Sequence, residues 1–236
     1  RSDHDMLNDL AHRVGQAEHW WDDFEGGLDY ILEPAGIKWQ DFKKMDYIRG
    51  PVNYRKYQDR GFSTPTKKFE LYSTLLENWG YDPLPKFREP PESPVSMPER
   101  HEQFPYILIT GARSPGFFHT ENRQVPWLRE LHKDPVVEIH PQTAEKEGIK
   151  EGQWVIIESV RGKVRQRAKI FGGIHPKVVG AQHAWWFPEK KDPGHGWDES
   201  NINILTDNAY DTCDPAMGAT SVRTLLCRIY PENRYR

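Results

Sequence analysis

The chain has 236 residues, a formal net charge of −3, 28% charged residues and 12% aromatic residues, nine of them Trp. This charge gives no reason to expect nucleic acid or an anionic membrane surface as a partner, and no apolar run reaches the roughly 20 residues that span a bilayer. The aromatic content excludes a disordered chain and predicts a folded, loop-rich protein. The first residues, RSDHDMLNDL, have no initiator Met and no signal pattern, so we expect a boundary inside a longer polypeptide. The compartment stays open between cytoplasm and periplasm.

The N-terminal part, residues 1–82, has mainly helical patterns. We expect helices over 3–14, ended by Gly15, over 20–32 and over 39–45. A loop leading into a short strand is expected within 61–73. Ser73 is the expected N-cap of a short helix over 73–79.

Residues 83–105 contain seven prolines. Such density disfavours helix and central strand, so we expect an extended surface linker here. The linker is the best predicted domain boundary, with a helical segment at 1–82 before it and a second domain at 106–236 after it.

The pattern changes to strands from Tyr106 onward. We expect strands over 106–110, 136–140, 153–160, 163–171, 178–186 and 224–230, with helices over 122–132 and 141–147. Short strands with helices between them predict a β-rich, mixed α/β fold built on a barrel rather than a doubly wound sheet. One strand alternates, with four cations on one face: Lys163, Arg165, Arg167 and Lys169. We expect this face to be solvated, with a docking face for another domain as the alternative.

The two cysteines, Cys213 and Cys227, are too few for a disulfide framework or for a four-cysteine zinc or iron–sulfur site. Cys227 lies in an apolar run that predicts a buried strand. Two reduced thiols are the favoured state, and a single bridge is the alternative.

The first expected strand of the second domain runs into a glycine-bearing loop, TGARSPGFFHTENRQ, at residues 110–124. Gly111 and Gly116 would let backbone amides approach a ligand, and a following helix start favours anions. A plain turn is the alternative. The spacing is not G-x-G-x-x-G, which disfavours a Rossmann-like nucleotide enzyme.

Polar side chains crowd this loop, and arginine is the natural bidentate partner of phosphate. The cluster consists of Arg113, Ser114, His119, Thr120, Glu121, Asn122, Arg123 and Gln124. This density suits a large polar heterocycle with phosphates. We interpret His119 as a hydrogen-bonding residue, with a structural role and a metal-ligand role as alternatives.

Two later segments are candidates for the same site. The first, QHAWWF at 182–187, is either a strand end with core aromatics or a loop at the mouth of a barrel. The second, SNINILT at 200–206, carries Asn201 and Asn203, whose amides suit either a turn or the edge of a guanine or pterin ring.

In this order and spacing, the segments TGARSPGFFHTENRQ, VEIHPQTAEKEGIKEGQWVIIES, WWFPE and NINILT resemble the C-terminal part of molybdenum- or tungsten-bis(pterin guanine dinucleotide) oxidoreductases, the dimethyl-sulfoxide-reductase family. PTKKFELYS and DPLPKFREPPESP resemble the linker before that domain, so the resemblance covers most of the chain. The resemblance implies a double-psi β-barrel that holds molybdopterin guanine dinucleotide.

The resemblance also implies which residues line the cofactor: Thr110, Gly111, Arg113, Ser114, His119, Thr120, Asn122, Arg123, Gln124, His183, Trp186 and Asn203. No residue is expected to be catalytic or to bind metal directly. The family's metal-ligand domain and iron–sulfur cysteine motif have no match here. We therefore expect a C-terminal fragment that is inactive alone and binds no cofactor tightly alone. The expected partners are the remaining domains of the same enzyme and an iron–sulfur electron-transfer subunit. The alternative is a stand-alone double-psi barrel that acts as a binding module.

Overall fold

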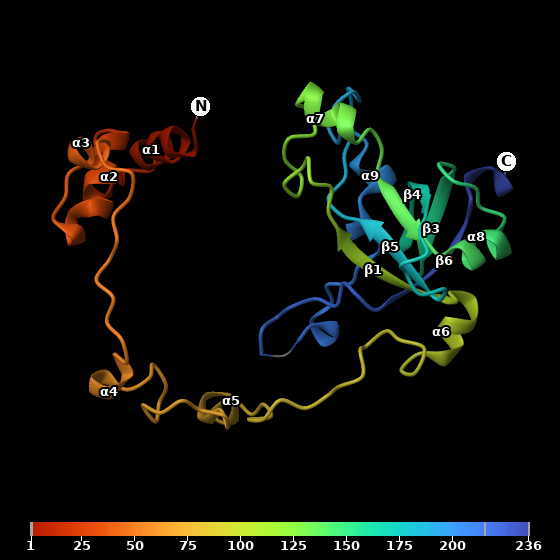
Figure 1. Cartoon of the computed structure of the whole chain (residues 1–236), viewed down its shortest axis with the longest axis horizontal. Coiled ribbons are helices and arrows are strands. Elements are labelled where there is room, and N and C mark those ends of the chain that lie inside the picture. Colours follow the sequence, from red (N-terminus) through yellow and green to blue (C-terminus); the bar gives the residue numbers. More distant parts are fainter. Residues whose placement is uncertain (1, 215, 236) are drawn as a thin grey trace. The chain divides into compact units, whose positions relative to one another are not determined.

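The computed structural model describes residues 2–214 and 216–235 (Figure 1). Positions 1, 215 and 236 fall within the predicted domain ranges but lie outside the described residues. The chain divides into two compact units, Arg1–Ser63 and Thr64–Arg236. This division falls before the proline-rich segment, which belongs to the second unit. The assignment of 1–82, 83–105 and 106–236 as domains stays a prediction.

The first unit is helical, with α1 (Asp3–Arg13), α2 (Phe24–Leu32), α3 (Trp39–Phe42) and α4 (Tyr57–Arg60). Short 3-10 turns lie at Ala17–His19 and Glu33–Ala35. Helix α1 starts at a capping box between Ser2 and Asp5. Helix α2 starts later than predicted because the Asp23 carboxylate accepts a hydrogen bond from the Gly26 amide at 2.7 Å and caps it.

The second unit begins with a segment of few regular elements. Helix α5 (Thr74–Asn78) has the predicted cap, since the Ser73 hydroxyl accepts from the Leu76 amide at 3.2 Å. The strand expected within 61–73 was wrong. Glu70 instead accepts hydrogen bonds from Thr66 and Thr74, and such local side-chain bonds favour turns. The proline-rich linker also contains a helix, α6 (Pro98–Gln103), because proline is tolerated in the first helical turn.

A closed six-stranded barrel forms the rest of the second unit. Its strands are β1 (Tyr106–Ala112), β2 (Val136–Ile139), β3 (Trp154–Ser159), β4 (Gly162–Ile170), β5 (Val178–Gln182) and β6 (Leu225–Pro231). The spatial order is β1-β5-β2-β4-β3-β6, with β1–β5 and β2–β4 parallel and the other pairs antiparallel. The β-rich, mixed α/β barrel fold is therefore confirmed, and a doubly wound sheet is excluded.

Connections between the strands carry three α-helices: α7 (Pro126–Leu131), α8 (Pro141–Glu147) and α9 (Trp197–Ser200). Three 3-10 turns follow at Ile202–Leu205, Tyr210–Thr212 and Glu232–Tyr235. Helix α8 has the predicted bounds. Helix α7 is shorter than the predicted 122–132 because its first turn starts at Pro126 and the residues before it form turns.

The barrel interior is mainly apolar and is filled by every second residue of the strands. Leu108, Val137, Ile139, Val155 and Ile157 are fully buried there. Burial of such side chains stabilises the fold by roughly 1.5–3 kcal/mol each. Cys227 on β6 is also buried, and its burial raises the pKa of the thiol; both cysteines are free, as favoured from the sequence.

The cationic face of β4 is paired with carboxylates. Arg165 contacts Glu199 and Glu232 at 2.7 and 2.9 Å. Arg167 contacts Asp134 at 3.2 Å, and both guanidinium groups lie over the Trp154 ring. These ion pairs leave no broad unpaired basic stripe on this strand. Among the described residues, no helix has the length and hydropathy needed to cross a membrane.

Candidate functional site

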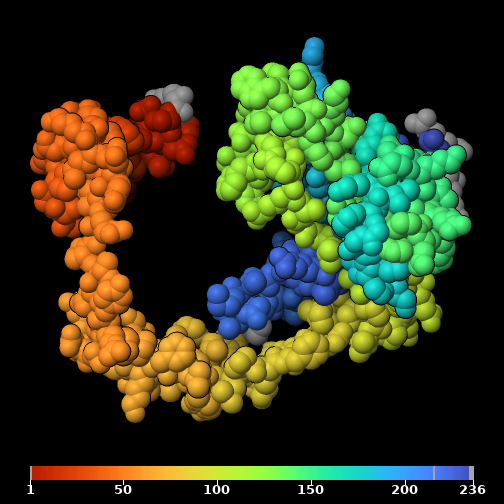
Figure 2. Space-filling model, in the orientation of Figure 1, coloured from red at the N-terminus to blue at the C-terminus, as the bar shows by residue number. Residues whose placement is uncertain are grey.

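The loop 110–124 and the segment after β5 meet at one end of the barrel. Strands β1 and β5 are parallel neighbours, with Thr110 opposite Ala181 and Ala112 opposite Gln182. Because parallel strands end on the same side, the residues that follow them lie together. Figure 2 shows the loop and α7, in yellow-green and green, as a continuous patch on the visible face of the barrel unit.

The base of the loop is fixed to the segment that precedes β6. The Thr110 amide and hydroxyl both donate to the Val222 carbonyl, at 3.0 and 2.9 Å. Gly111 follows with φ +100°, a conformation that few other residues adopt, and a Cβ there would meet no atom within 4 Å. Thr110 therefore anchors the loop, and Gly111 leaves the backbone open to an approaching ligand.

Two predicted site residues from distant parts of the chain are in direct contact. Nδ1 of His119 lies 3.0 Å from Nε2 of His183, and Nδ1 of His183 lies 3.2 Å from the Ala112 carbonyl oxygen. Burial lowers the pKa of His183, and the neighbouring His119, Arg113 and Arg123 lower it further. The bond to the Ala112 carbonyl opposes this lowering of the His183 pKa, and His119 beside it is exposed.

Arg123 is the buried cation of the loop. It is 3% exposed, its guanidinium lies 4.9 Å from the Phe117 ring centroid and 4.5 Å from that of Trp185, and it donates to the His119 carbonyl at 2.5 Å. Its Nε and the indole Nε1 of Trp185 are buried without a hydrogen-bond partner. Burial lowers the pKa of Arg123 to about 10. Unsatisfied buried donors are rare in folded proteins, so this pair of donors requires an explanation.

A second contact joins the two segments. The Trp186 indole donates to the Thr120 carbonyl at 2.6 Å, and the Trp186 ring packs edge-on against His195. Trp186 and Thr120, both predicted site residues, therefore help to hold the loop against the segment that follows β5.

The remaining predicted loop residues supply an open set of donors and acceptors. Arg113 and Gln124 are exposed, while Ser114 and Asn122 are half-buried. Within residues 2–214 and 216–235, neither Arg113 nor Arg123 forms an ion pair. The enclosed space beside them is only about 10 Å³, room for a single water molecule. This donor set fits the phosphates and polar rings of a pterin dinucleotide, which would lie across the open face.

Asn203 lies on the 3-10 turn Ile202–Leu205. Its amide nitrogen donates to the Asn201 side chain at 3.1 Å, and its carbonyl accepts from Thr206, so its recorded hydrogen bonds stay within this turn. Ser200, just before the turn, accepts a hydrogen bond from the Gln166 side chain, which also donates to the carbonyl of Gln182 at the end of β5. Its place in a site shared with the loop stays a prediction.

A buried polar network lies beneath the loop and was not predicted from the sequence. The Gln166 amide donates to the Gln182 carbonyl at 2.8 Å and accepts from the Gln182 amide at 3.1 Å. The Gln182 side chain in turn accepts from the Val136 amide and contacts His132. Burial lowers the pKa of His132. A signal was present, because Gln166 stands among apolar residues on the buried face of β4.

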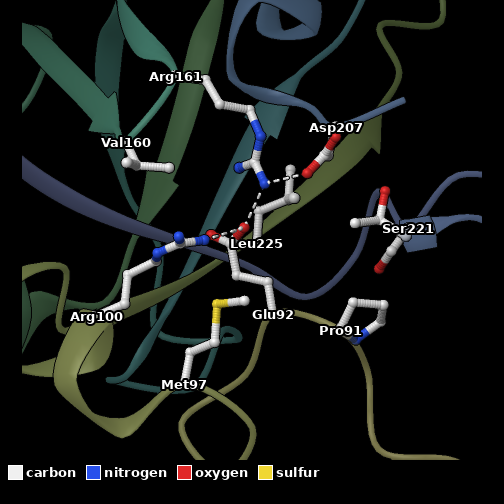
Figure 3. Close-up of a pocket in the computed structure, with 10 residues that line it drawn as sticks. Pro91, Glu92, Met97, Arg100, Val160, Arg161, Asp207, Ser221 and Leu225 are labelled. Atoms are coloured by element: carbon white, nitrogen blue, oxygen red, sulfur yellow. Dashed lines mark hydrogen bonds and ion pairs between the residues drawn. The ribbon is translucent and has the colours of Figure 1, made fainter. Parts of the chain in front are cut away.

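A second polar cluster lines a cavity of about 360 Å³ at another part of the barrel (Figure 3). Glu92, 4% exposed, accepts from the Leu226 amide at 2.8 Å and from Arg161 at 2.6 Å. Arg161 also donates to Asp207 at 2.6 Å, and Arg100 lies 3.4 Å from Glu92. We call these four residues the Glu92 cluster. Glu92 and Arg100 belong to the proline-rich linker and Arg161 to the barrel, so the cluster fastens the linker to the barrel. Its charges are paired with one another.

In the described part of the chain, no group of three or more His, Cys, Asp or Glu residues is arranged to hold a metal ion. The groups that the candidate site offers are hydrogen-bond donors and acceptors, positive charge and aromatic rings.

Comparison with known proteins identifies the family. Residues 106–224 match the model of the molydopterin dinucleotide binding domain. The dopamine dehydroxylase of Eggerthella lenta is 42% identical over 180 residues, covering 73% of this chain and 17% of that protein. The acetylene hydratase of Syntrophotalea acetylenica is 31% identical over 233 residues, covering 95% of this chain and 32% of that protein.

A solved structure agrees with this assignment. The acetylene hydratase from Pelobacter acetylenicus superposes with a TM-score of 0.90 and 29% identity, covering 98% of this chain and 33% of that one. The chain thus spans between about a sixth and a third of the lengths of these three proteins. It belongs to the molydopterin dinucleotide binding domain family and corresponds to the C-terminal cofactor-binding part of larger molybdopterin oxidoreductases.

Proposed function

We propose that the loop 110–124, with His183, Trp186 and Asn203, forms one wall of the site that holds molybdopterin guanine dinucleotide. The observation that carries this proposal is Arg123, a buried cation with an unpartnered Nε, beside the unpartnered indole of Trp185. Burying a charge is costly unless a partner compensates it. An anionic, hydrogen-bonding ligand across the open face supplies that compensation.

The residues divide into those that bind and those that position. Arg113, exposed and outside any ion pair in the described chain, is suited to a phosphate of the dinucleotide. Ser114, Asn122 and Gln124 supply further polar contacts at the same face. Arg123 holds the His119 carbonyl and so orients the loop. The bound metal and its dithiolenes supply the redox or Lewis-acid chemistry, while these residues bind and orient the cofactor.

We propose that the opposite wall comes from the other domains of the same enzyme. The chain matches 17% to 33% of the lengths of the three proteins compared above, which leaves most of such a polypeptide to provide that wall and the metal's protein ligand. An iron–sulfur electron-transfer subunit is a further partner suggested by the family resemblance. Relatives named as a dehydroxylase and a hydratase differ in reaction type, so the proposal names a cofactor and not a substrate.

Charge reversal in the full-length enzyme tests the loop. We expect Arg113→Glu to lower the molybdenum or tungsten content and the guanine nucleotide released on acid hydrolysis by at least about tenfold, because an attractive contact becomes a repulsive one. Lys150→Glu is the matched control, since Lys150 is exposed beyond α8 and outside the loop. Equal cofactor content in Arg113→Glu and wild type would reject the proposed role of Arg113.

The 236-residue chain provides a second test. We expect it to retain no stoichiometric metal when purified alone, because one wall makes only part of the contacts. Stoichiometric metal or reductase activity with an artificial electron donor would contradict this expectation and favour a self-sufficient binding module.

A further inference from the structure

Helix α1 of the first unit, in red in Figure 1, exposes its apolar residues to solvent. Met6, Leu7, Leu10 and Val14 are between 49% and 58% exposed. Because successive residues of an α-helix turn by about 100°, these four side chains fall within an arc of roughly 100° and form one stripe along the helix. We call these four residues the α1 stripe.

The side of α1 that packs against its own unit carries polar groups. The His4 side chain is 14% exposed and meets Phe24 edge-on, with 5.0 Å between the ring centroids. Nε2 of His4 and Oδ1 of Asn8 are buried and have no hydrogen-bond partner among the described residues, and Ala11 is buried as well. A surface helix normally buries its apolar face and exposes its polar face. Helix α1 does the reverse, so packing within the first unit does not explain the α1 stripe.

The α1 stripe has the features of a docking face. Met6, Leu10 and Val14 are spaced four residues apart and form a ridge, the arrangement that packs into the groove of another helix. One edge of the stripe carries an ion pair, in which the Arg13 guanidinium lies 3.2 Å from the Asp9 carboxylate. An exposed apolar patch with a polar edge is typical of a surface that binds another protein segment.

The size of the α1 stripe favours a partner that is covalently linked to it. An 11-residue helix is about 16 Å long and about 10 Å wide, so one face offers on the order of 200 Å². A stable interface between separate chains buries about 800 Å² on each partner, which two α1 helices cannot supply. A segment of the same polypeptide needs less area, because the covalent link gives it a high effective concentration.

Such a segment is available in polypeptides of this family. The structural match to acetylene hydratase covers 98% of this chain but 33% of that protein. Two per cent of 236 residues is about five residues, so most of α1 lies within the matched part. About two thirds of that polypeptide lies outside the match and is available to cover the corresponding helix face.

We infer that the α1 stripe docks onto an apolar surface of the polypeptide outside these 236 residues and so fastens the first unit to a further domain of the same enzyme. The inference rests on the part of the proposed function that places this chain in a longer polypeptide, and it does not depend on the cofactor site. The ridge of Met6, Leu10 and Val14 makes the central contact.

Hydroxyl-radical footprinting of the full-length, wild-type enzyme, read by mass spectrometry, tests the docking. We expect Met6 and Leu10 to be oxidised several-fold more slowly in the folded enzyme than in its tryptic digest, well beyond the twofold that half exposure alone would give. His12 is exposed on the opposite face of α1 and should be oxidised at similar rates in both samples. Equal protection of Met6 and His12, or protection of neither, would overturn the inference.

A matched pair of variants tests whether the apolar face carries the contact. Leu10→Asp places a charge in the α1 stripe, and His12→Asp places the same charge on the opposite face. We expect Met6 to be oxidised several-fold faster in Leu10→Asp and at the wild-type rate in His12→Asp, because an unpaired charge in an apolar contact is costly. A Met6 rate in Leu10→Asp equal to wild type would contradict docking through the stripe.

Photo-crosslinking identifies the partner when Leu10 is replaced by p-benzoylphenylalanine in the full-length enzyme. We expect crosslinks to peptides outside these 236 residues, in a product with the mass of a single polypeptide. Crosslinks to a second copy or to residues 64–236, or no crosslink at all, would overturn the assigned partner. The cofactor content of Arg113→Glu tests the proposed function separately, and a normal content there would leave this inference standing.

Discussion

The loop end of the barrel and the Glu92 cluster both contain buried or half-buried arginines, but they differ in how the charge is compensated. In the Glu92 cluster, Arg161 lies 2.6 Å from both Glu92 and Asp207. At the loop end, Arg123 is more deeply buried and has aromatic faces and a carbonyl as its partners. The comparison supports a structural role for the first cluster, whose charges the chain pairs itself, and the proposed binding role for the second, whose arginine has no carboxylate partner in the described chain.

The largest effect is expected from breaking the satisfied cluster. Glu92→Ala removes the acceptor of the Leu226 amide and leaves Arg161 with one carboxylate, so we expect the free energy of unfolding to fall by about 3–5 kcal/mol. Urea denaturation read by hydrogen exchange of the barrel amides measures it. Glu145→Ala, at an exposed site on α8, is the control. A loss in Glu92→Ala no greater than that of the control would show that the cluster does not stabilise the barrel.

The second effect lies beneath the loop. Gln166→Leu fits the apolar interior but leaves the Gln182 amide and carbonyl without their buried partner, so we expect a loss of about 2 kcal/mol. Lys163→Leu, on the exposed face of the same strand, should stay within about 0.5 kcal/mol of wild type. Thermal unfolding compares the two variants, and equal melting temperatures would show that the glutamine network does not stabilise the structure beneath the loop.

The third prediction contrasts the two arginines directly. Arg123→Met removes a buried charge without a carboxylate partner, so we expect the free energy of unfolding to stay within about 1 kcal/mol of wild type or to rise. In the full-length enzyme the same change should lower cofactor content, because the loop loses its anchor on His119. Arg161→Met should instead destabilise the barrel. If Arg123→Met proves as destabilising as Arg161→Met, the distinction between the two clusters fails.

The fold was predictable where local patterns and core patterns agreed. The strand positions followed from apolar runs, and α8 and the Ser73 cap followed from single residues with known preferences. The prediction of a strand within 61–73 was wrong because the Glu70 carboxylate accepts hydrogen bonds from the hydroxyls of Thr66 and Thr74. The spacing of apolar residues does not reveal this contact. Helix α6 was not predicted, because the density of prolines indicated an extended segment, whereas Pro98 occupies the first turn of a helix, where proline is tolerated.

The sequence predicted contacts of the loop that the structure contains, but it did not predict the residues that support the loop. The crowding of polar residues marked 110–124, and family resemblance added His183 and Trp186, which the structure brings against His119 and Thr120. The supporting glutamine network depends on the pairing of β4 with β2 and of β2 with β5, which no local pattern encodes. The Glu92 cluster joins residues that are far apart in the sequence, so no local pattern predicted it either.

The smallest effect is expected from pH. Burial lowers the pKa of His132 and of His183 in the folded chain below the ordinary value of 6.5. Between 6.5 and those lowered values the unfolded chain binds more protons than the folded chain, so stability is full above 6.5 and falls as the pH falls through this window. Arg123, Arg129 and Lys169 lower the pKa of His132, while its bond to Gln182 opposes them. Urea denaturation at pH 7.5 and pH 5.5 should therefore show a loss on acidification that is smaller in His132→Gln. His175→Gln should keep the wild-type slope, since His175 is exposed. If the wild-type chain were more stable at pH 5.5 than at pH 7.5, the pH dependence would have the opposite sign. Protonation of these histidines would then stabilise the folded chain without a ligand.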